Sequence, residues 1–436
     1  MLTSLFWRPR WPASPVPVYL LFSGATALFS TLVFTLNLVY QATVVGLSPL
    51  QLVLVGTVLE ATCFLFEVPT GIVADLYSRR LSIIIGFVLI GAGFILEGSV
   101  PTFAAVLTTQ VLWGLGYTFT SGATEAWITD EVGEHQMAPV FLRATRAGLL
   151  GTVIGIMLSG SLGLISIQLP IVLGGVGYIT LALVLLLVMP ERNFHRTPPG
   201  DRSTFQQMTA TFRDGVALAR SREIVRTLLL VSLVAGLASE AFDRLWVVHL
   251  LDSFTFPEIF GTRNPVVLFA LLALAGTLLS LVASASIERV SPGTISHLHP
   301  TRLMTGLAGL EVFAIVTFVL AGVAGNLWLA VGALWLKSIC GTLSYPISAA
   351  WMNRNLESRT RATVLSMGGQ ANAIGQVAGG PALGWIGSAI SVPAALIGSA
   401  VVLSPIVGLY ARSASTGKAS DHELNEPAGK EIATPT

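Results

Sequence analysis

The sequence predicts an all-α membrane protein in which twelve transmembrane helices form two six-helix halves. Three observations support this fold class: the composition, a series of twelve apolar runs, and a repeat that relates the two halves. Of the 436 residues, 53% are hydrophobic and only 11% are charged, less than half of the charged fraction of an average soluble domain. The formal net charge of +1 provides no field that would attract nucleic acid. This composition excludes a cytosolic enzyme, a nucleic-acid-binding protein and a disordered protein.

Twelve runs of the sequence are long and apolar enough to cross a bilayer. A helix needs about 20 apolar residues to span a hydrocarbon core of about 30 Å. The first run is too long for the core of a signal peptide and no small-residue cleavage site follows it, so we expect it to be retained as a helix. The predicted spans are residues 16–40, 49–74, 81–98, 103–128, 140–163, 168–189, 224–250, 265–287, 302–321, 326–350, 362–386 and 391–411.

The basic residues predict the orientation of these spans. If the N-terminus is cytoplasmic, all but three of the 24 lysines and arginines lie on the inner side; Arg244 and Lys337 fall within spans and Arg263 in an outer loop. Basic residues are retained on the cytoplasmic side, so we expect a multi-pass protein of the inner (plasma) membrane with both termini cytoplasmic. Residues 1–15, with tryptophans beside arginines, are predicted to anchor the N-terminus at the interface, and residues 412–436 to form a disordered cytoplasmic tail.

A polar segment at residues 191–223 separates a predicted six-helix bundle at 16–190 from a second at 224–411. Apolar residues recur at helical spacing between Phe205 and Ala219. This stripe predicts either a short amphipathic helix on the inner membrane face or a solvated linker with chance spacing.

The two predicted bundles share short sequence features in corresponding positions. Arg-Ala-Thr opens both the fifth span (143–145) and the eleventh (361–363), and Ala-Trp ends both the fourth (126–127) and the tenth (350–351). Duplicated halves are a recurring architecture of secondary transporters, with the substrate site near the midplane between them.

The loop between the second and third spans carries the motif Gly-x-x-x-Asp-x-x-x-Arg-Arg at Gly71, Asp75, Arg79 and Arg80. Gly71 allows close helix approach, and Asp75 can stabilise the positive N-terminus of a neighbouring helix. This motif and the duplicated twelve-span plan resemble the major facilitator superfamily over nearly the whole chain. The resemblance implies that the motif locks the cytoplasmic ends of the two halves together in an outward-open state. The alternative is a basic loop that only sets topology.

The same resemblance implies partners for the motif. Asp75 would face the start of the eleventh span near Arg361, while Arg79 or Arg80 would meet acids such as Asp130 or Glu131. Residues 121–130 are also similar to bacterial drug and macrolide exporters of this superfamily, and the Gly-Gly-Pro at 379–381 resembles a displaced version of a motif of drug exporters. These similarities imply efflux.

Glu60 and Glu67 lie inside the second predicted span, where an ionisable residue costs on the order of 3 kcal/mol. Glu60 is roughly 16 Å from the outer end of the span at the helical rise, close to the midplane. Glu67 is on the same face, with Gly56 and Gly71, and we expect this stripe to face the protein interior. Burial favours the neutral form of a carboxyl group, which suits a group that binds and releases a proton. The alternative is a neutral glutamate hydrogen-bonded to a neighbouring helix.

The seventh span carries Glu240, Asp243 and Arg244 near its middle. Glu240 and Arg244 are four residues apart, the spacing of an ion pair within one helix. Asp243 is then either free to bind a proton or a cation, or a polar spectator. Glu311 and Lys337 lie at mid-depth in adjacent spans and are predicted to form a buried ion pair; an unpaired Lys337 would instead favour an anionic substrate.

Two pairs of amides, Asn37 with Gln41 and Asn372 with Gln376, each share a helix face and are predicted to add polar groups to a central cavity. The family resemblance implies that the first and eleventh spans line such a cavity. Aromatic residues in these and related spans would give it apolar walls that tolerate cations: Phe34, Trp113, Tyr117, Trp246, Trp335 and Tyr345.

The leading hypothesis is a secondary active transporter that works by alternating access, with proton-coupled efflux of amphipathic drugs or other toxic small molecules. Protonation of Glu60, Glu67 or Asp243 would expel the substrate by removing its counter-charge. The alternative is proton-coupled uptake of a small solute. A membrane-embedded transferase is a distant alternative, because short outer loops leave no room for a soluble donor.

The sequence contains no phosphate-binding Gly-x-x-x-x-Gly-Lys loop, and His297 and His299 have no third metal ligand beside them. We therefore expect no enzymatic activity, cofactor or metal. The expected partners are a small-molecule substrate, protons and the lipid bilayer, without nucleic acid, and we expect a monomer.

Overall fold

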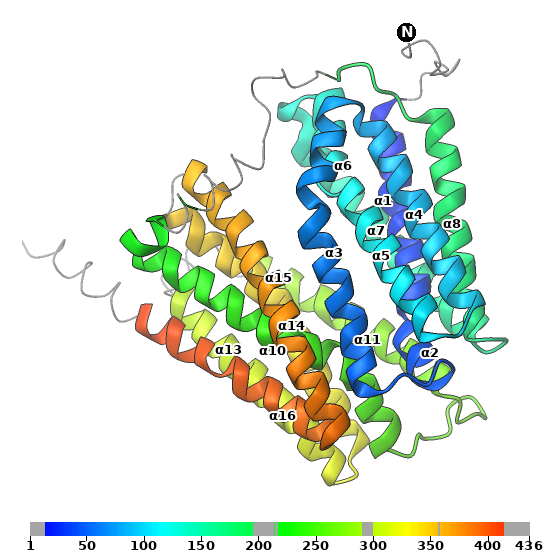
Figure 1. Ribbon diagram of the computed structural model, residues 1–436, viewed down its shortest axis with the longest axis vertical. Helices are drawn as coiled ribbons and strands as arrows, with labels where there is room; N and C mark the ends of the chain where they lie inside the picture. The colour runs from blue at the N-terminus through cyan, green and yellow to red at the C-terminus, as the bar shows by residue number, and fades with distance from the viewer. Residues whose placement is uncertain (1–13, 195–212, 214–216, 290–299, 356–357, 414–436) are drawn as a thin grey trace, which may run out of the picture.

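The computed structural model describes residues 14–194, 213, 217–289, 300–355 and 358–413, and the regular structure of this part of the chain is helical (Figure 1). The first half contains α1 Pro15–Phe34, α2 Asn37–Thr43, α3 Pro49–Leu76, α4 Arg79–Ser99, α5 Phe103–Thr120, α6 Ala123–Val132, α7 Met137–Gly163 and α8 Gln168–Val188. The second half contains α10 Glu223–Ser253, α11 Pro265–Arg289, α13 Pro300–Val323, α14 Leu327–Asn355, α15 Ser358–Ala389 and α16 Val392–Leu403.

The predicted fold class is confirmed. Ten helical segments of the described chain are long and apolar enough to cross a membrane. The other two predicted spans, the fourth and the eleventh, are present as α5 with α6 and as α15. Both are less apolar: α5 has only 18 residues, and α15 is rich in glycine and amide side chains.

Two spans that were predicted as continuous are broken. The fourth span divides between α5 and α6 at Gly122, whose φ of 70° lies in the left-handed region that glycine tolerates. The first span divides between α1 and α2, where the Leu36 N–H donates to Val33 O. The hydroxyls of Thr31 and Thr35 donate to carbonyl oxygens four residues back, an arrangement that bends helices.

Polar caps explain several of the sharp helix starts. The Ser48 side chain accepts from the Gln51 N–H and the Gln51 side chain accepts from the Ser48 N–H, which forms a capping box before Pro49. The Ser78 hydroxyl oxygen accepts from the Leu81 N–H at the start of α4. These caps fix the points at which the chain turns back into the bundle.

The two halves repeat one packing pattern. The first and fifth spans of the first half, α1 and α7, pack against each other, as do the corresponding α10 and α15 of the second half. Glycines allow the closest approaches: a Cβ on Gly91 of α4 would lie 2.6 Å from the carbonyl oxygen of Gly175 in α8. Within each half the helices are therefore held as a closely packed unit.

Among the described residues, the halves meet at one end of the bundle. We call this the Ser48 end, after the residue that caps α3, and the opposite end, where α4 begins, the Arg79 end. At the Ser48 end, the Leu50 N–H donates to Ser388 Oγ at 2.8 Å, and a Cβ on Gly163 would contact Val266 of α11. At the Arg79 end the halves part (Figure 1), and a Cβ on Gly71 would have no atom within 4 Å.

Candidate substrate cavity and charge network

A cavity of about 1010 Å³ lies between the two halves. The first half contributes α1 and α7 to its wall, and the second half contributes α10, α11 and α14. Its lining extends from Phe269, towards the Ser48 end, to Thr145 and Ser284, towards the Arg79 end. Because the halves are joined at the Ser48 end, access to this cavity is from the Arg79 end.

The cavity combines an aromatic wall with a row of hydroxyl groups. Phe34, Trp246 and Trp335, three of the aromatic residues predicted from the sequence, line it. Thr277 and Ser280 of α11 contribute hydroxyl groups to the same lining. Large apolar surface with a few fixed polar groups is typical of sites for amphipathic small molecules.

The charged residues at the cavity form a network of three side chains: Asp243, Lys337 and Glu311. The Lys337 Nζ lies 3.6 Å from Asp243 Oδ1 and 3.6 Å from Glu311 Oε1, and 4.6 Å from the centre of the Phe242 ring. Glu311 and Lys337 lie together as predicted, but their side chains are 26% and 21% exposed, so the pair is only partly buried. Asp243 is not left without a counter-charge, because α14 places Lys337 against it; its predicted binding of a proton or a cation stays a prediction. With both carboxylates ionised, the network carries a net charge of −1.

Lys337 also borders a second, smaller cavity. This cavity, of about 190 Å³, lies within the second half and is lined by Glu311 and Tyr410 as well as Lys337. Asp243 lines the central cavity, and its side chain is 55% exposed, whereas that of Glu311 is 26% exposed. The lysine therefore lies between a carboxylate that faces the substrate cavity and one that faces the interior of the second half.

The predicted ion pair within the seventh span is confirmed. Arg244 Nε donates to Glu240 Oε1 at 2.8 Å, and Glu240 is 3% exposed. A Cβ on Gly56 of α3 would overlap Glu240 Oε1, so the pair lies directly against the other half. Glu60, one helical turn further along α3, is half-buried and within electrostatic range of Arg244.

Several predicted site residues lie away from the central cavity. Neither Glu60 nor Glu67 is part of its lining, and Glu67 is exposed. Gln376 Nε2 donates to Asn372 Oδ1 at 2.7 Å, and Asn372 Nδ2 donates to Ser232 O at 3.2 Å, so this amide pair joins α15 to α10.

The other amide pair, Asn37 and Gln41, is buried in the core of the first half and not in the cavity. Its partner is Glu97 of α4, a residue that the sequence reasoning missed. Gln41 Nε2 donates to Glu97 Oε1 at 2.7 Å, and the Tyr40 hydroxyl donates to the Glu97 carbonyl oxygen at 2.6 Å. Glu97 is fully buried although it lies two residues from the end of α4, and the one signal in the sequence was an acid inside the third predicted span, 81–98.

The family model of the Major Facilitator Superfamily matches residues 18–310, about two thirds of the chain. The chain belongs to the major facilitator superfamily. It is 24% identical over 203 residues to the uncharacterized MFS-type transporter YxaM of Bacillus subtilis (strain 168); this match covers 47% of the chain and 51% of YxaM, so the chain spans about half the length of that relative.

Solved transporter structures share the fold. The nucleoside transporter NupG is 14% identical, with a TM-score of 0.70 over 92% of this chain and 99% of NupG. A POT family transporter in complex with a thioalcohol-conjugated peptide is 13% identical, with a TM-score of 0.71 over 92% of this chain and 96% of that one. A bacterial homologue of the lysosomal transporter Spinster, in an inward-facing conformation, is 15% identical with a TM-score of 0.64 over 91% and 95%. The family and the fold indicate a multi-pass membrane transporter rather than an enzyme.

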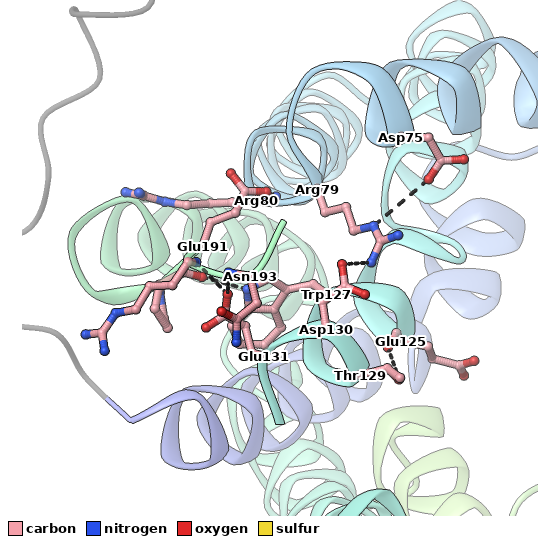
Figure 2. Close-up of polar contacts among 12 residues, drawn as sticks. Asp75, Arg79, Arg80, Glu125, Trp127, Thr129, Asp130, Glu131, Glu191 and Asn193 are labelled. Carbon is pink, nitrogen blue, oxygen red and sulfur yellow. Dashed lines mark hydrogen bonds and ion pairs between the residues drawn. The ribbon is translucent and has the colours of Figure 1, made fainter. Parts of the chain in front are cut away.

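The superfamily motif builds a polar cluster at the Arg79 end of the first half (Figure 2). Arg79 Nη1 donates to Asp130 Oδ2 of α6, as predicted, and Arg79 Nε lies 4.0 Å from Asp75 Oδ1. Asp75 is 54% exposed and α3 ends beside it. The side chain of Arg361 lies outside the described part of the structure, so its predicted contact with Asp75 stays a prediction.

Two further acids, Glu191 and Glu131, complete this cluster by accepting hydrogen bonds from backbone N–H groups and from one hydroxyl group. Glu191 accepts from the Ser78 hydroxyl at 2.6 Å and from the Arg80 N–H at 3.0 Å. Glu131 Oε1 accepts from the N–H groups of Arg192 and Asn193, although the sequence predicted it as a partner of the motif arginines (Figure 2). The Arg80 side chain instead donates to the Leu186 carbonyl oxygen. The motif therefore joins α3, α4, α6 and the end of α8 within one half.

Other predictions lie outside the described residues or side chains. They are the interfacial anchor at 1–13, most of the stripe at 205–219, the side chain of Tyr345, the histidines at 297 and 299, and the tail from residue 414.

Proposed function

We propose that this protein is a secondary active transporter of the inner membrane that works by alternating access and exports amphipathic small molecules, cations among them, in exchange for protons. The observation that carries the proposal is the position of Asp243. This carboxylate faces the central cavity and shares Lys337 with Glu311. It is therefore available both to a substrate cation and to a proton.

Competition for Asp243 supplies the coupling. A proton on Asp243 removes the net charge of −1 and leaves Lys337 and Glu311 as a balanced pair. A substrate cation beside Asp243 cancels the same charge, so the two ligands exclude each other. Exchange follows if the protein changes conformation when either a proton or a substrate is bound, but stays in one conformation when Asp243 binds neither. A ligand can cause such a shift because its affinity for the two states differs.

The cavity suits substrates with an apolar body and a positive group. Trp246 and Trp335 line the cavity, and a contact between a cation and an aromatic ring contributes about 0.5–2 kcal/mol. The basic residues predict that the Arg79 end is cytoplasmic. The described conformation would then open inwards and collect substrate from the cytoplasm.

Uptake of a polar solute is a second candidate function. The hydroxyl groups of Thr277, Ser280 and Ser284 form a row along one face of α11 in the cavity. Such a row could hydrogen-bond a hydroxylated or amide-rich solute, and the similar structures include a nucleoside transporter and a transporter bound to a peptide derivative.

Accumulation of a fluorescent amphipathic cation in cells that overexpress the chain tests the proposal. We expect lower accumulation than in control cells, restoration by a protonophore, and loss of the effect in Asp243→Asn. Asp252→Asn is the matched control, because Asp252 is an exposed acid of the same helix outside the cavity lining. Unchanged accumulation across a broad panel of cations would rule out export, and gradient-driven transport by Asp243→Asn at the wild-type rate would rule out the role of Asp243.

A further inference from the structure

The carboxyl group of Glu97 is sealed in the first half near the Ser48 end. Glu97 is 0% exposed, its Oε1 accepts a hydrogen bond from Gln41 Nε2, and the Asn37 side chain lies close enough to act on the carboxyl group as a second donor. No lysine or arginine forms an ion pair with it among the described residues. An isolated buried carboxylate costs several kcal/mol, so a counter-charge or a proton is needed here.

Several buried oxygen atoms of Glu97 and the two amides lack a hydrogen-bond donor within the described part of the chain. Among the described residues, three buried oxygen atoms have no hydrogen-bond partner: Glu97 Oε2, Asn37 Oδ1 and Gln41 Oε1. Asn37 and Gln41 are 4% and 1% exposed and lie one turn apart on α2. A proton on Glu97 adds a single donor and leaves at least one of the two amide oxygens unsatisfied, whereas a cation can accept lone pairs from all three oxygens.

The backbone adds further oxygen atoms at this position. The first span breaks directly before Asn37, and the Leu36 N–H donates to Val33 O instead of to Leu32 O. The carbonyl oxygen of Leu32 therefore does not accept from the Leu36 N–H. Breaks in membrane helices free carbonyl groups that can coordinate small cations.

We propose that Asn37, Gln41 and Glu97 form a sodium-binding site in the first half. Carboxylate and amide oxygens are hard ligands, which disfavours soft transition metals. One carboxylate balances one positive charge, which favours a monovalent ion over Ca²⁺ or Mg²⁺. The site is separate from the Asp243 network and does not depend on the proposed export function.

The position of the site links its occupancy to the transport cycle. The helix α2, which carries both amides, packs against α10 of the second half at the joined Ser48 end. Opening at the Ser48 end would separate α2 from α10 and so change the packing around both amides.

The test is sodium binding by the purified full-length protein in detergent. Thermal unfolding and binding of radioactive ²²Na⁺ are measured while NaCl replaces choline chloride at constant ionic strength, at pH 6.5 and pH 8. We expect a saturable rise in the unfolding temperature with sodium. Glu97→Gln should abolish it, and Asn37→Ala and Gln41→Leu should each raise the half-saturating sodium concentration about tenfold or more.

Two controls match the substitutions. Glu60→Gln removes another membrane-embedded carboxyl group of the same half, and Gln110→Leu removes another buried amide whose Oε1 has no partner among the described residues. Both should keep the wild-type sodium response. If Glu97→Gln does not fold, the two amide variants still decide the question.

Absence of a sodium response in the wild-type protein would overturn the proposal, as would an equal response in all three site variants. Stabilisation by low pH alone, lost in Glu97→Gln, would make Glu97 a proton site and overturn the sodium assignment. These experiments measure ion binding and not transport. A negative result would therefore contradict the sodium site alone and not the export proposal, which depends on Asp243.

Discussion

The carboxylate of Glu240 occupies the space that a side chain on Gly56 would need. A Cβ on Gly56 would overlap Glu240 Oε1 and would lie 2.7 Å from Arg244 Nε. Gly56 belongs to α3 of the first half, and the ion pair belongs to α10 of the second half. Because Gly56 has no side chain, the ion pair of Glu240 and Arg244 can pack directly against α3. This contact is one of those that hold the Ser48 end closed.

Gly56→Ala should therefore destabilise the described conformation relative to the one that opens at the Ser48 end. Overpacking costs about 1–3 kcal/mol, which corresponds to a shift of roughly 5–150-fold in the ratio of the two states. A cysteine at Ser280 in the cavity, with Cys63 and Cys340 replaced, reports the state by its labelling with a thiol reagent applied from the Arg79 end. We expect slower labelling in Gly56→Ala.

Gly306→Ala is the control for this substitution, because a Cβ on Gly306 has no atom within 4 Å. It should label at the wild-type rate. Equal labelling of the two alanine variants would show that the contact between Gly56 and Glu240 does not hold the halves together.

Lys337→Gln should be more harmful than Asp243→Asn. Loss of the lysine leaves two carboxylates without a counter-charge, and we expect the free energy of unfolding to fall by on the order of 2 kcal/mol. This is less than the roughly 3–5 kcal/mol of a fully buried pair, because the Asp243 side chain is 55% exposed. Asp243→Asn leaves Lys337 paired with Glu311 and should cost less than about 1 kcal/mol.

Denaturant unfolding of the purified variants measures this difference. The double variant Lys337→Gln with Glu311→Gln should recover part of the loss, since it removes the more buried of the two unpaired acids. Equal stability of Lys337→Gln and Asp243→Asn would contradict a shared lysine.

Trp246→Ala should weaken the binding of an amphipathic cation and leave the rate at saturation nearly unchanged. The ring lines the cavity, and loss of a cation–aromatic contact of about 1–2 kcal/mol predicts a rise in KM of roughly 5–30-fold. Flux into proteoliposomes at several substrate concentrations separates KM from kcat. Trp328→Ala, at an exposed tryptophan outside the cavity lining, should leave both values as in wild type. A fall in kcat without a change in KM would place Trp246 outside the substrate site.

The sequence was informative where the decisive spacing is local. Glu240 and Arg244 lie one turn apart on one helix, so their pairing needed no tertiary information. The position of Lys337 against Asp243 depends on how α14 packs against α10, which no local pattern encodes. Glu60 stands out in the sequence because it lies near mid-membrane, whereas Glu97 lies near a helix end, where a charge usually reaches water.

The two helix breaks, at Gly122 and before Asn37, could not be predicted from the local sequence either. Gly122 is one glycine among 43, and its left-handed φ could not be distinguished from that of any other glycine in an apolar run. The break before Asn37 has neither a proline nor a glycine within it. It became visible only from the backbone hydrogen bonds, and with it the separation of Asn37 and Gln41 from the predicted cavity.

The pairing of Arg79 with Asp130 should appear as a coupling energy within the first half. Arg79→Gln and Asp130→Asn each remove one side of a partly buried pair, with side chains 16% and 28% exposed. We expect each single variant to lower the free energy of unfolding and the double variant to lose less than the sum, with a coupling of about 1 kcal/mol. Arg80→Gln combined with Asp130→Asn is the matched cycle and should be additive within about 0.5 kcal/mol, because Arg80 binds the Leu186 carbonyl oxygen instead. Additivity in both cycles would mean that the motif arginine does not hold α6 against α4 in this conformation, and that its stabilising contact is made only when the Arg79 end is closed.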